Sequence, residues 1–226
     1  MRKCCRIVLL ILLLAGGMAV GQDFSFKVKY GMIQAGHAHL TLKVHDGYLK
    51  GHLNIESSPW LSKLWSLSDS IKSDYDIKSG QLQSHIKSIH EGAYHRNYEV
   101  HFTDSNSVLI NGRERVLATQ GLRDIPSLLY DLSRMHFSHG DTLHFRLWDG
   151  QGFGKLELLA EQSAGPSLLH PFAEAGWKLI PLSSSRKSRE NRIQLTLLLS
   201  ETFPHTPIKI EIDTKYGSIL MQVIMP

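Results

Sequence analysis

AHLTLKVHDGYLKGHLNI, residues 38–55, is the stretch that most clearly indicates the fold of this chain. Apolar and polar residues alternate over positions 38–45, which is the two-residue period of a β-strand with one buried face. Asp46-Gly47 then predicts a tight hairpin turn, and Leu53 and Ile55 continue the return strand. The stretch therefore predicts two antiparallel strands.

The same alternation recurs along most of the chain. It covers Phe24–Tyr30, Ile71–Ile77, Tyr94–Phe102, Leu143–Leu147, Ile193–Leu199, Ile208–Ile212 and Ile219–Val223. Asn111-Gly112 is the strongest local hairpin signal, because both residues tolerate the positive φ angles that a two-residue turn requires. Strands at this spacing predict an all-β, mainly antiparallel fold, a curved β-barrel or sandwich with one or two short helices.

Two segments have helical spacing instead. Pro59–Leu67 places apolar residues on one face of a short amphipathic helix, which we expect to plug one end of a barrel. In Asp124–His136, Asp124 can cap the helix and Pro126 suits the first turn. The second helix has one apolar stripe, made of Ile125, Leu128, Leu129, Leu132 and Met135.

The N-terminus has the three regions of a secretory signal peptide. A basic start precedes the apolar run Ile7–Ala15, and small residues follow at Ala19 and Gly21. The apolar run is too short for a permanent membrane anchor, so we expect cleavage after Gly21. Residues 1–21 would then be the signal peptide, and residues 22–226 a single β-rich domain that is periplasmic or secreted.

Removal of this segment changes the chemistry of what remains. Both cysteines, Cys4 and Cys5, leave with it, so no thiol, disulfide or cysteine metal site is expected. Three of the 25 basic residues also leave. The remaining 22 basic and 21 acidic residues give a net charge of +1. This balance provides no basic footprint for nucleic acid, and we expect no nucleic-acid partner. No cofactor is predicted.

His37 and His39 are the candidate metal ligands. Residues two apart on a strand share a face, so both imidazoles can reach one ion if a third ligand comes from elsewhere. The alternative is that both are polar residues facing solvent beside Ala38 and Leu40. The chain has no G-x-S-x-G nucleophile motif, so it is not an α/β-hydrolase.

Six residues are candidates for ligand binding. Two tryptophans lie on the first expected helix, and their aromatic surface can also contact a lipid or a protein partner. The other candidates are three tyrosines and one arginine, and the full set is Trp60, Trp65, Tyr75, Tyr94, Tyr130 and Arg134.

Phe26–Ala38 resembles the opening strand pair of the domain of unknown function (DUF) 3108 family, exported bacterial envelope proteins. The resemblance continues through Ser57–Pro59, Ser68–Ser70, Glu91–Arg96, Asp124–Arg134, Gly140-Asp141 and the region from Ser200 to Ser218. It covers nearly the whole chain after residue 21. The family brings no established reaction or catalytic residues. A fold-level analogy to periplasmic lipoprotein carriers, whose curved sheets hold acyl chains, is consistent with a lipid-like ligand.

We therefore expect a non-enzymatic periplasmic envelope protein. Its ligand would be a lipid-like chain inside the curved sheet, or an envelope polymer such as a polysaccharide on its rim. One alternative is a metal-dependent hydrolase that uses His37, His39 and a third side chain. The other is a structural partner of an envelope complex, with Trp60, Trp65 and the sheet edges as contacts to an envelope protein.

Overall fold

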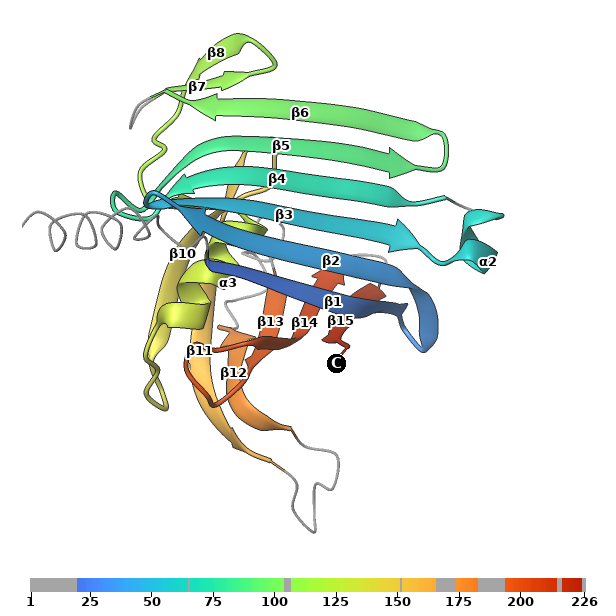
Figure 1. Ribbon diagram of the computed structural model, residues 1–226, viewed down its shortest axis with the longest axis vertical. Helices are drawn as coiled ribbons and strands as arrows, with labels where there is room; N and C mark the ends of the chain where they lie inside the picture. Colours follow the sequence, from blue (N-terminus) through green and yellow to red (C-terminus); the bar gives the residue numbers. More distant parts are fainter. Residues whose placement is uncertain are drawn as a thin grey trace, which may run out of the picture.

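Alternating apolar and polar residues build one continuous sheet, in which most neighbouring strands also follow one another along the chain (Figure 1). The computed structural model describes residues 20–64, 66–103, 107–150, 152–165, 174–182, 194–214 and 217–224. The strands in these residues are β1 (Val20–Tyr30), β2 (Ile33–His45), β3 (Tyr48–Ser57), β4 (Ser68–Asp76), β5 (Gln81–Glu91), β6 (Tyr94–Phe102), β7 (Ser107–Ile110), β8 (Arg113–Val116), β9 (Leu122–Arg123), β10 (Thr142–Trp148), β11 (Phe153–Ala164), β12 (Ala175–Pro181), β13 (Gln194–Leu199), β14 (Pro207–Thr214) and β15 (Gly217–Val223).

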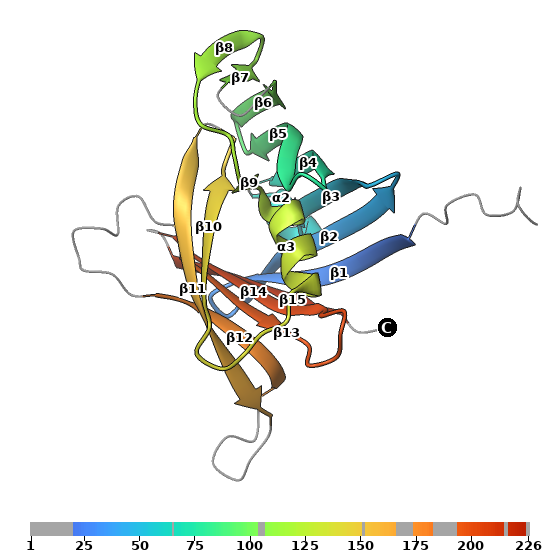
Figure 2. The same ribbon diagram turned by 90° about the vertical axis from the view of Figure 1, so that its left-hand side faces the viewer.

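The sheet has the strand order β8-β7-β6-β5-β4-β3-β2-β1-β15-β14-β13-β12-β11-β10-β9. Every neighbouring pair is antiparallel except β9 and β10. Because β1 pairs with β15, the first and last strands meet in the middle of the sheet. Figure 2 shows the sheet bending so that its two halves face each other across helix α3 (Ile125–Arg134). The all-β, mainly antiparallel prediction is confirmed, with the curved sheet open.

The predicted hairpin turns are also confirmed. Asp46 and Gly47 join β2 to β3 with φ angles of 50° and 82°, and Asn111 and Gly112 join β7 to β8 with φ angles of 49° and 75°. Two successive residues with positive φ form the turn whose twist matches that of the flanking strands. β1 begins at Val20, which pairs with Val44. The expected signal peptide otherwise lies outside the described residues.

One face of the sheet forms the core. Along β2, Ala38, Leu40 and Leu42 are buried while His37 and His39 are exposed, as the alternation predicts. The inner residues of the opposite half are mostly leucines and are equally buried: Leu156, Leu158, Leu179, Leu195, Leu197 and Leu199. They form one cluster with the apolar side chains of α3. The interior between the two halves is thus closely filled.

Helix α3 supplies the middle of this core. It packs on β2, β3, β4 and β9, and Leu128, Leu129 and Leu132 are buried. The Asp124 side chain caps its first turn as predicted, and Ser127 completes a reciprocal capping box. The helix approaches β3 closely at Gly51, where a Cβ atom would collide with Pro126 and would also crowd the Ser73 hydroxyl.

The prediction for the first helix is wrong in length and in role. Helix α2 is one turn, Pro59–Ser62, with no side-chain cap and no buried residue. It lies beyond the end of β3, and Trp60 is half exposed instead of plugging the sheet. α3 fills the concave side in its place. Trp65 lies outside the described residues. Neither described helix is long and apolar enough to cross a bilayer.

The two edge regions of the sheet meet through side chains. The Phe102 ring on β6 packs edge-on against Trp148 on β10, with ring centroids 5.5 Å apart. Lys87 Nζ on β5 donates to the carbonyl of Asp149, at 3.1 Å. Arg123 on β9 donates to the carbonyl of Gly80, at 2.7 Å. Side-chain contacts thus join the two edge regions of the open sheet, and no backbone ladder crosses this seam among the described residues.

The close approach at Gly51 generates a stability prediction. We expect Gly51→Ala to lower the free energy of unfolding by about 1–3 kcal/mol, because the new methyl group overpacks the contact between β3 and Pro126. Gly152→Ala is the matched control, since a Cβ atom there meets nothing within 4 Å. Urea denaturation followed by circular dichroism gives both values. Equal stability of the two variants would contradict the packing account.

Candidate functional site

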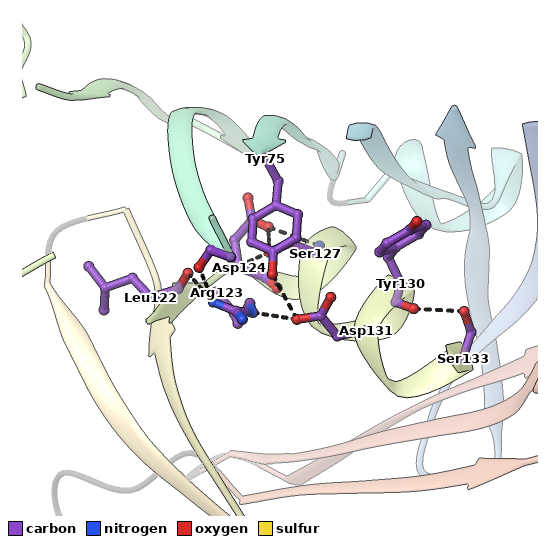
Figure 3. A network of polar contacts seen from close by, with 9 residues as sticks. Tyr75, Leu122, Arg123, Asp124, Ser127, Tyr130, Asp131 and Ser133 are labelled. Atoms are coloured by element: carbon purple, nitrogen blue, oxygen red, sulfur yellow. Dashed lines mark hydrogen bonds and ion pairs between the residues drawn. The ribbon is translucent and has the colours of Figure 1, made fainter. Parts of the chain in front are cut away.

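A buried polar cluster joins the start of α3 to β5, and Figure 3 shows two of its members, Asp124 and Ser127. Oδ1 of Asp124 accepts hydrogen bonds from the Ser127 backbone N–H, at 3.1 Å, and from its hydroxyl, at 2.7 Å. Oδ2 of Asp124 lies 2.9 Å from Nδ1 of His85. All three side chains are almost inaccessible to solvent. The Asp124 cap is evident from local sequence, but its partner His85 is not, because His85 is 39 residues away.

This cluster contains the residue types of a hydrolytic triad in the wrong order. A catalytic histidine lies between the serine and the carboxylate, so that it can take the serine proton. Here the carboxylate lies between the other two, and Ser127 donates to Asp124. Burial opposes ionisation of Asp124, but the hydrogen bonds and charge of His85 and the hydrogen bonds of Ser127 outweigh it and lower the pKa. The cluster is a structural anchor.

A second polar network lies one helical turn further along α3. The Tyr75 hydroxyl donates to Oδ2 of Asp131 at 2.9 Å, and Nε of Arg123 donates to the same oxygen at 2.5 Å (Figure 3). The Arg123 guanidinium also lies 4.8 Å from the centre of the Tyr75 ring. Burial, and then the charge of Asp131, raise the pKa of Tyr75. Tyr75 is thus buried and paired within this network.

Tyr130 and Arg134 form a pair near the end of α3. The guanidinium carbon lies 4.1 Å from the centre of the buried Tyr130 ring. Arg134 Nη1 donates to the Ser133 hydroxyl, which donates to the Tyr130 carbonyl. Burial raises the pKa of Tyr130. Within the described part of the chain, no carboxylate pairs with Arg134, and no residue bonds to the Tyr130 hydroxyl.

Aromatic side chains surround the turn that follows this pair. The Phe137 ring lies 5.6 Å from that of Trp177 and 5.2 Å from that of His205, and Phe203 stacks on His136 at 5.0 Å. The His205 backbone N–H donates to the Ser133 carbonyl at 2.8 Å, which fixes this loop on the last turn of α3. We call these residues the α3-end site: Tyr130, Arg134, Phe137, Trp177, Phe203 and His205.

Of this site, only Tyr130 and Arg134 are predicted from the sequence. The other members come from three separate segments, and only the fold brings them together. Two further candidates lie elsewhere, since Trp60 and Tyr94 are half exposed at the ends of hairpins. The Tyr94 hydroxyl accepts a hydrogen bond from Arg96 at 3.3 Å. The candidates therefore separate into an α3 group and a hairpin group.

His37 and His39 share the exposed face of β2, as expected. Nε2 of His37 lies 3.3 Å from Nε2 of Gln34, and Nδ1 of His39 lies 3.0 Å from the Ser25 hydroxyl. No group of three or more histidine, cysteine, aspartate or glutamate residues in the described ranges is arranged to hold a metal ion. The hydrolase alternative thus gains no third ligand from the described residues.

A pocket of about 260 Å³ lies over strands β11 to β15. Its polar lining residues alternate with buried Leu179 and Ile210, so they face away from the core. Lys209 pairs with Glu174 at 3.0 Å, and Ser218 donates to Glu211 at 2.7 Å. Because three of its four charged lining residues, Glu174, Lys209 and Glu211, already have partners on the protein, this pocket is a weaker candidate than the α3-end site.

Comparison with protein families agrees with the fold and its extent. The model described as "Protein of unknown function (DUF3108)" matches residues 25–224. The chain belongs to the DUF3108 family. No curated protein matches it. The DUF3108 chain is also similar to the crystal structure of a β-barrel-like protein of domain of unknown function DUF1849 from Brucella abortus, with a TM-score of 0.59, 8% identity and coverage of 91% of this chain and 96% of that one.

The solved structure supports the architecture alone. At this identity, the DUF3108 chain shares a backbone arrangement with the Brucella protein, and no side-chain role transfers.

The buried carboxylate predicts how stability depends on pH. The pKa of Asp124 is lower in the folded state than in the unfolded state, so its contribution is complete above pH ~4 and declines as the pH falls below that value. We expect Asp124→Asn to lower the free energy of unfolding by about 2 kcal/mol at neutral pH, and this difference to shrink in acid. Urea titrations at a series of pH values test both. A difference that grows in acid would contradict this assignment.

Proposed function

We propose that this DUF3108 protein is an exported, non-enzymatic envelope protein that binds a lipid-like molecule with an acidic headgroup at the α3-end site. One observation carries the proposal: Arg134 has no carboxylate partner among the described residues and lies on a buried tyrosine beside a partly exposed aromatic cluster. Export is supported by the basic, apolar and small-residue regions of the first 21 residues.

The pair Tyr130 and Arg134 suits an anionic group. A guanidinium presents several N–H donors in one plane and binds carboxylate or phosphate through two parallel hydrogen bonds. Arg134 uses one nitrogen on the Ser133 hydroxyl, which leaves further donors for a ligand. The Tyr130 hydroxyl adds another donor. A partly buried cation without a counter-ion binds an anion more strongly than an exposed one, because water screens it less.

The neighbouring aromatic residues suit the apolar part of such a ligand. Phe203 is half exposed, while Phe137 and Trp177 are partly exposed. The interior between α3 and the sheet is less suitable, since Leu128 and Leu132 are fully buried against the core. We therefore propose that the ligand lies at the end of α3, and not deep inside the curved sheet.

Arg134→Met tests the proposal. The probes are dodecyl phosphate and the neutral amphiphile dodecyl maltoside, both below their micelle concentrations, with binding measured by calorimetry. We expect the protein to prefer the phosphate and Arg134→Met to weaken its binding by about ten- to a hundredfold, because charge-assisted hydrogen bonds are lost. Tyr130→Phe should have a smaller effect in the same direction.

Arg113→Met is the matched control, since Arg113 is an exposed arginine on the edge strand β8. It should bind both probes as the unaltered protein does. The proposal fails if the two amphiphiles bind equally well, or if Arg134→Met and Arg113→Met behave alike.

A further inference from the structure

Large apolar side chains gather on one end of the sheet. We define the hairpin end as residues 30–33, 59–64 and 92–94, which form the β1–β2 turn, the segment containing α2, and the β5–β6 turn. Half of the twelve exposed large apolar residues in the described chain lie there: Tyr30, Met32, Ile33, Trp60, Leu64 and Tyr94. None of them contributes to the α3-end site.

Strand register brings the three segments to the same end. β1 ends at Tyr30, which pairs with Ile33 at the start of β2. The end of β3 lies beside the same part of β2, because Ser57 pairs with Gly36. Leu67, which follows α2, forms a bridge with Glu91 at the end of β5. Figure 1 shows the two turns and α2 projecting from this end of the sheet.

The opposite end of the same strands is mainly polar, with Tyr48 as an exposed large apolar residue beside the β2–β3 turn. The β2–β3 turn there carries His45 and Asp46, and the β4–β5 turn is organised by Asp76. The Asp76 carboxylate accepts hydrogen bonds from the backbone N–H of Lys78 and from the backbone and hydroxyl of Ser79. Turns need no apolar residues for their own geometry. The exposed apolar residues of the hairpin end therefore call for a partner.

We propose that the hairpin end docks on the surface of a phospholipid bilayer that contains anionic headgroups. Three separate projecting segments, each with its own apolar tip, fit a soft planar partner. Tryptophan and tyrosine prefer the membrane interface, where the ring lies in an apolar layer and the polar group stays in water. Met32, at 100% exposed, and Leu64, at 82% exposed, provide side chains that can enter the acyl boundary.

The charges of the hairpin end match such a surface. Lys63 is its charged residue, and its three segments contain no carboxylate. Asp69 and Glu91 lie behind the tips, where Asp69 accepts the backbone N–H of His90 at 3.1 Å. Burial raises the pKa of both carboxyls. A lysine beside apolar tips favours anionic over neutral lipid.

The test uses the protein produced with its own N-terminal segment and purified after export, with its N-terminus checked by intact mass. Binding to vesicles of phosphatidylcholine, with and without phosphatidylglycerol, is measured by sedimentation. We expect binding to the mixed vesicles, and the double variant Met32→Ser, Leu64→Ser should reduce it at least about tenfold. Lys63→Glu should weaken binding to the mixed vesicles and leave binding to pure phosphatidylcholine unchanged.

Val116→Ser is the matched control, because Val116 is 89% exposed but lies on β8. It should bind vesicles as the unaltered protein does. The proposal is overturned if the unaltered protein ignores both vesicle types, if the double variant still binds, or if Val116→Ser loses binding equally. The double variant Met32→Ser, Leu64→Ser should still bind dodecyl phosphate, because neither residue belongs to the α3-end site, so failure at one site is distinguishable from failure at the other.

Discussion

The concave face of a curved sheet exposes apolar surface unless another element covers it. In the described part of this chain the sheet does not close through a backbone ladder, and α3 provides the cover. Its leucines face β2 to β4 on one side and belong to the same core cluster as the leucine-rich strands β11 to β13. The rest of the architecture depends on this arrangement, because the two halves of the sheet would otherwise face each other across an unfilled space.

Polar contacts determine where α3 lies, and apolar contacts make its position stable. Asp124 attaches the first turn to His85 on β5, while Asp131 attaches the middle to Tyr75 on β4 and Arg123 on β9. Each carboxylate has specific donors, so a displaced helix would leave buried charge unpaired, which is costly. The position of the α3-end site is fixed in the same way, since Tyr130 is adjacent to Asp131 and Arg134 lies on the last turn of the same helix.

Much of the fold was predictable, because alternation and turn chemistry act over short distances. The strands around Asp46-Gly47 and the helix capped by Asp124 needed only local sequence. Alternation alone does not identify β5, because buried His85 interrupts its apolar pattern and the register shifts opposite Asp74. β11 was not recognised either, because KLELLAE within it lacks a strict two-residue period. α2 was overestimated, because nothing in its spacing shows that it lies beyond the sheet and buries no residue.

The site was less predictable, because its members are distant in sequence. Tyr130 and Arg134 could be named from the helix, but Trp177 and His205 join them only through the curvature of the sheet. Curvature has a further consequence at the seam, where Phe102 meets Trp148 and Lys87 reaches Asp149. Widening a hydrogen-bonded barrel ruptures a whole row of interstrand amide bonds. Here the described ends of the sheet meet at the seam through side chains, so changes to the seam residues leave the interstrand hydrogen bonds of the described strands in place.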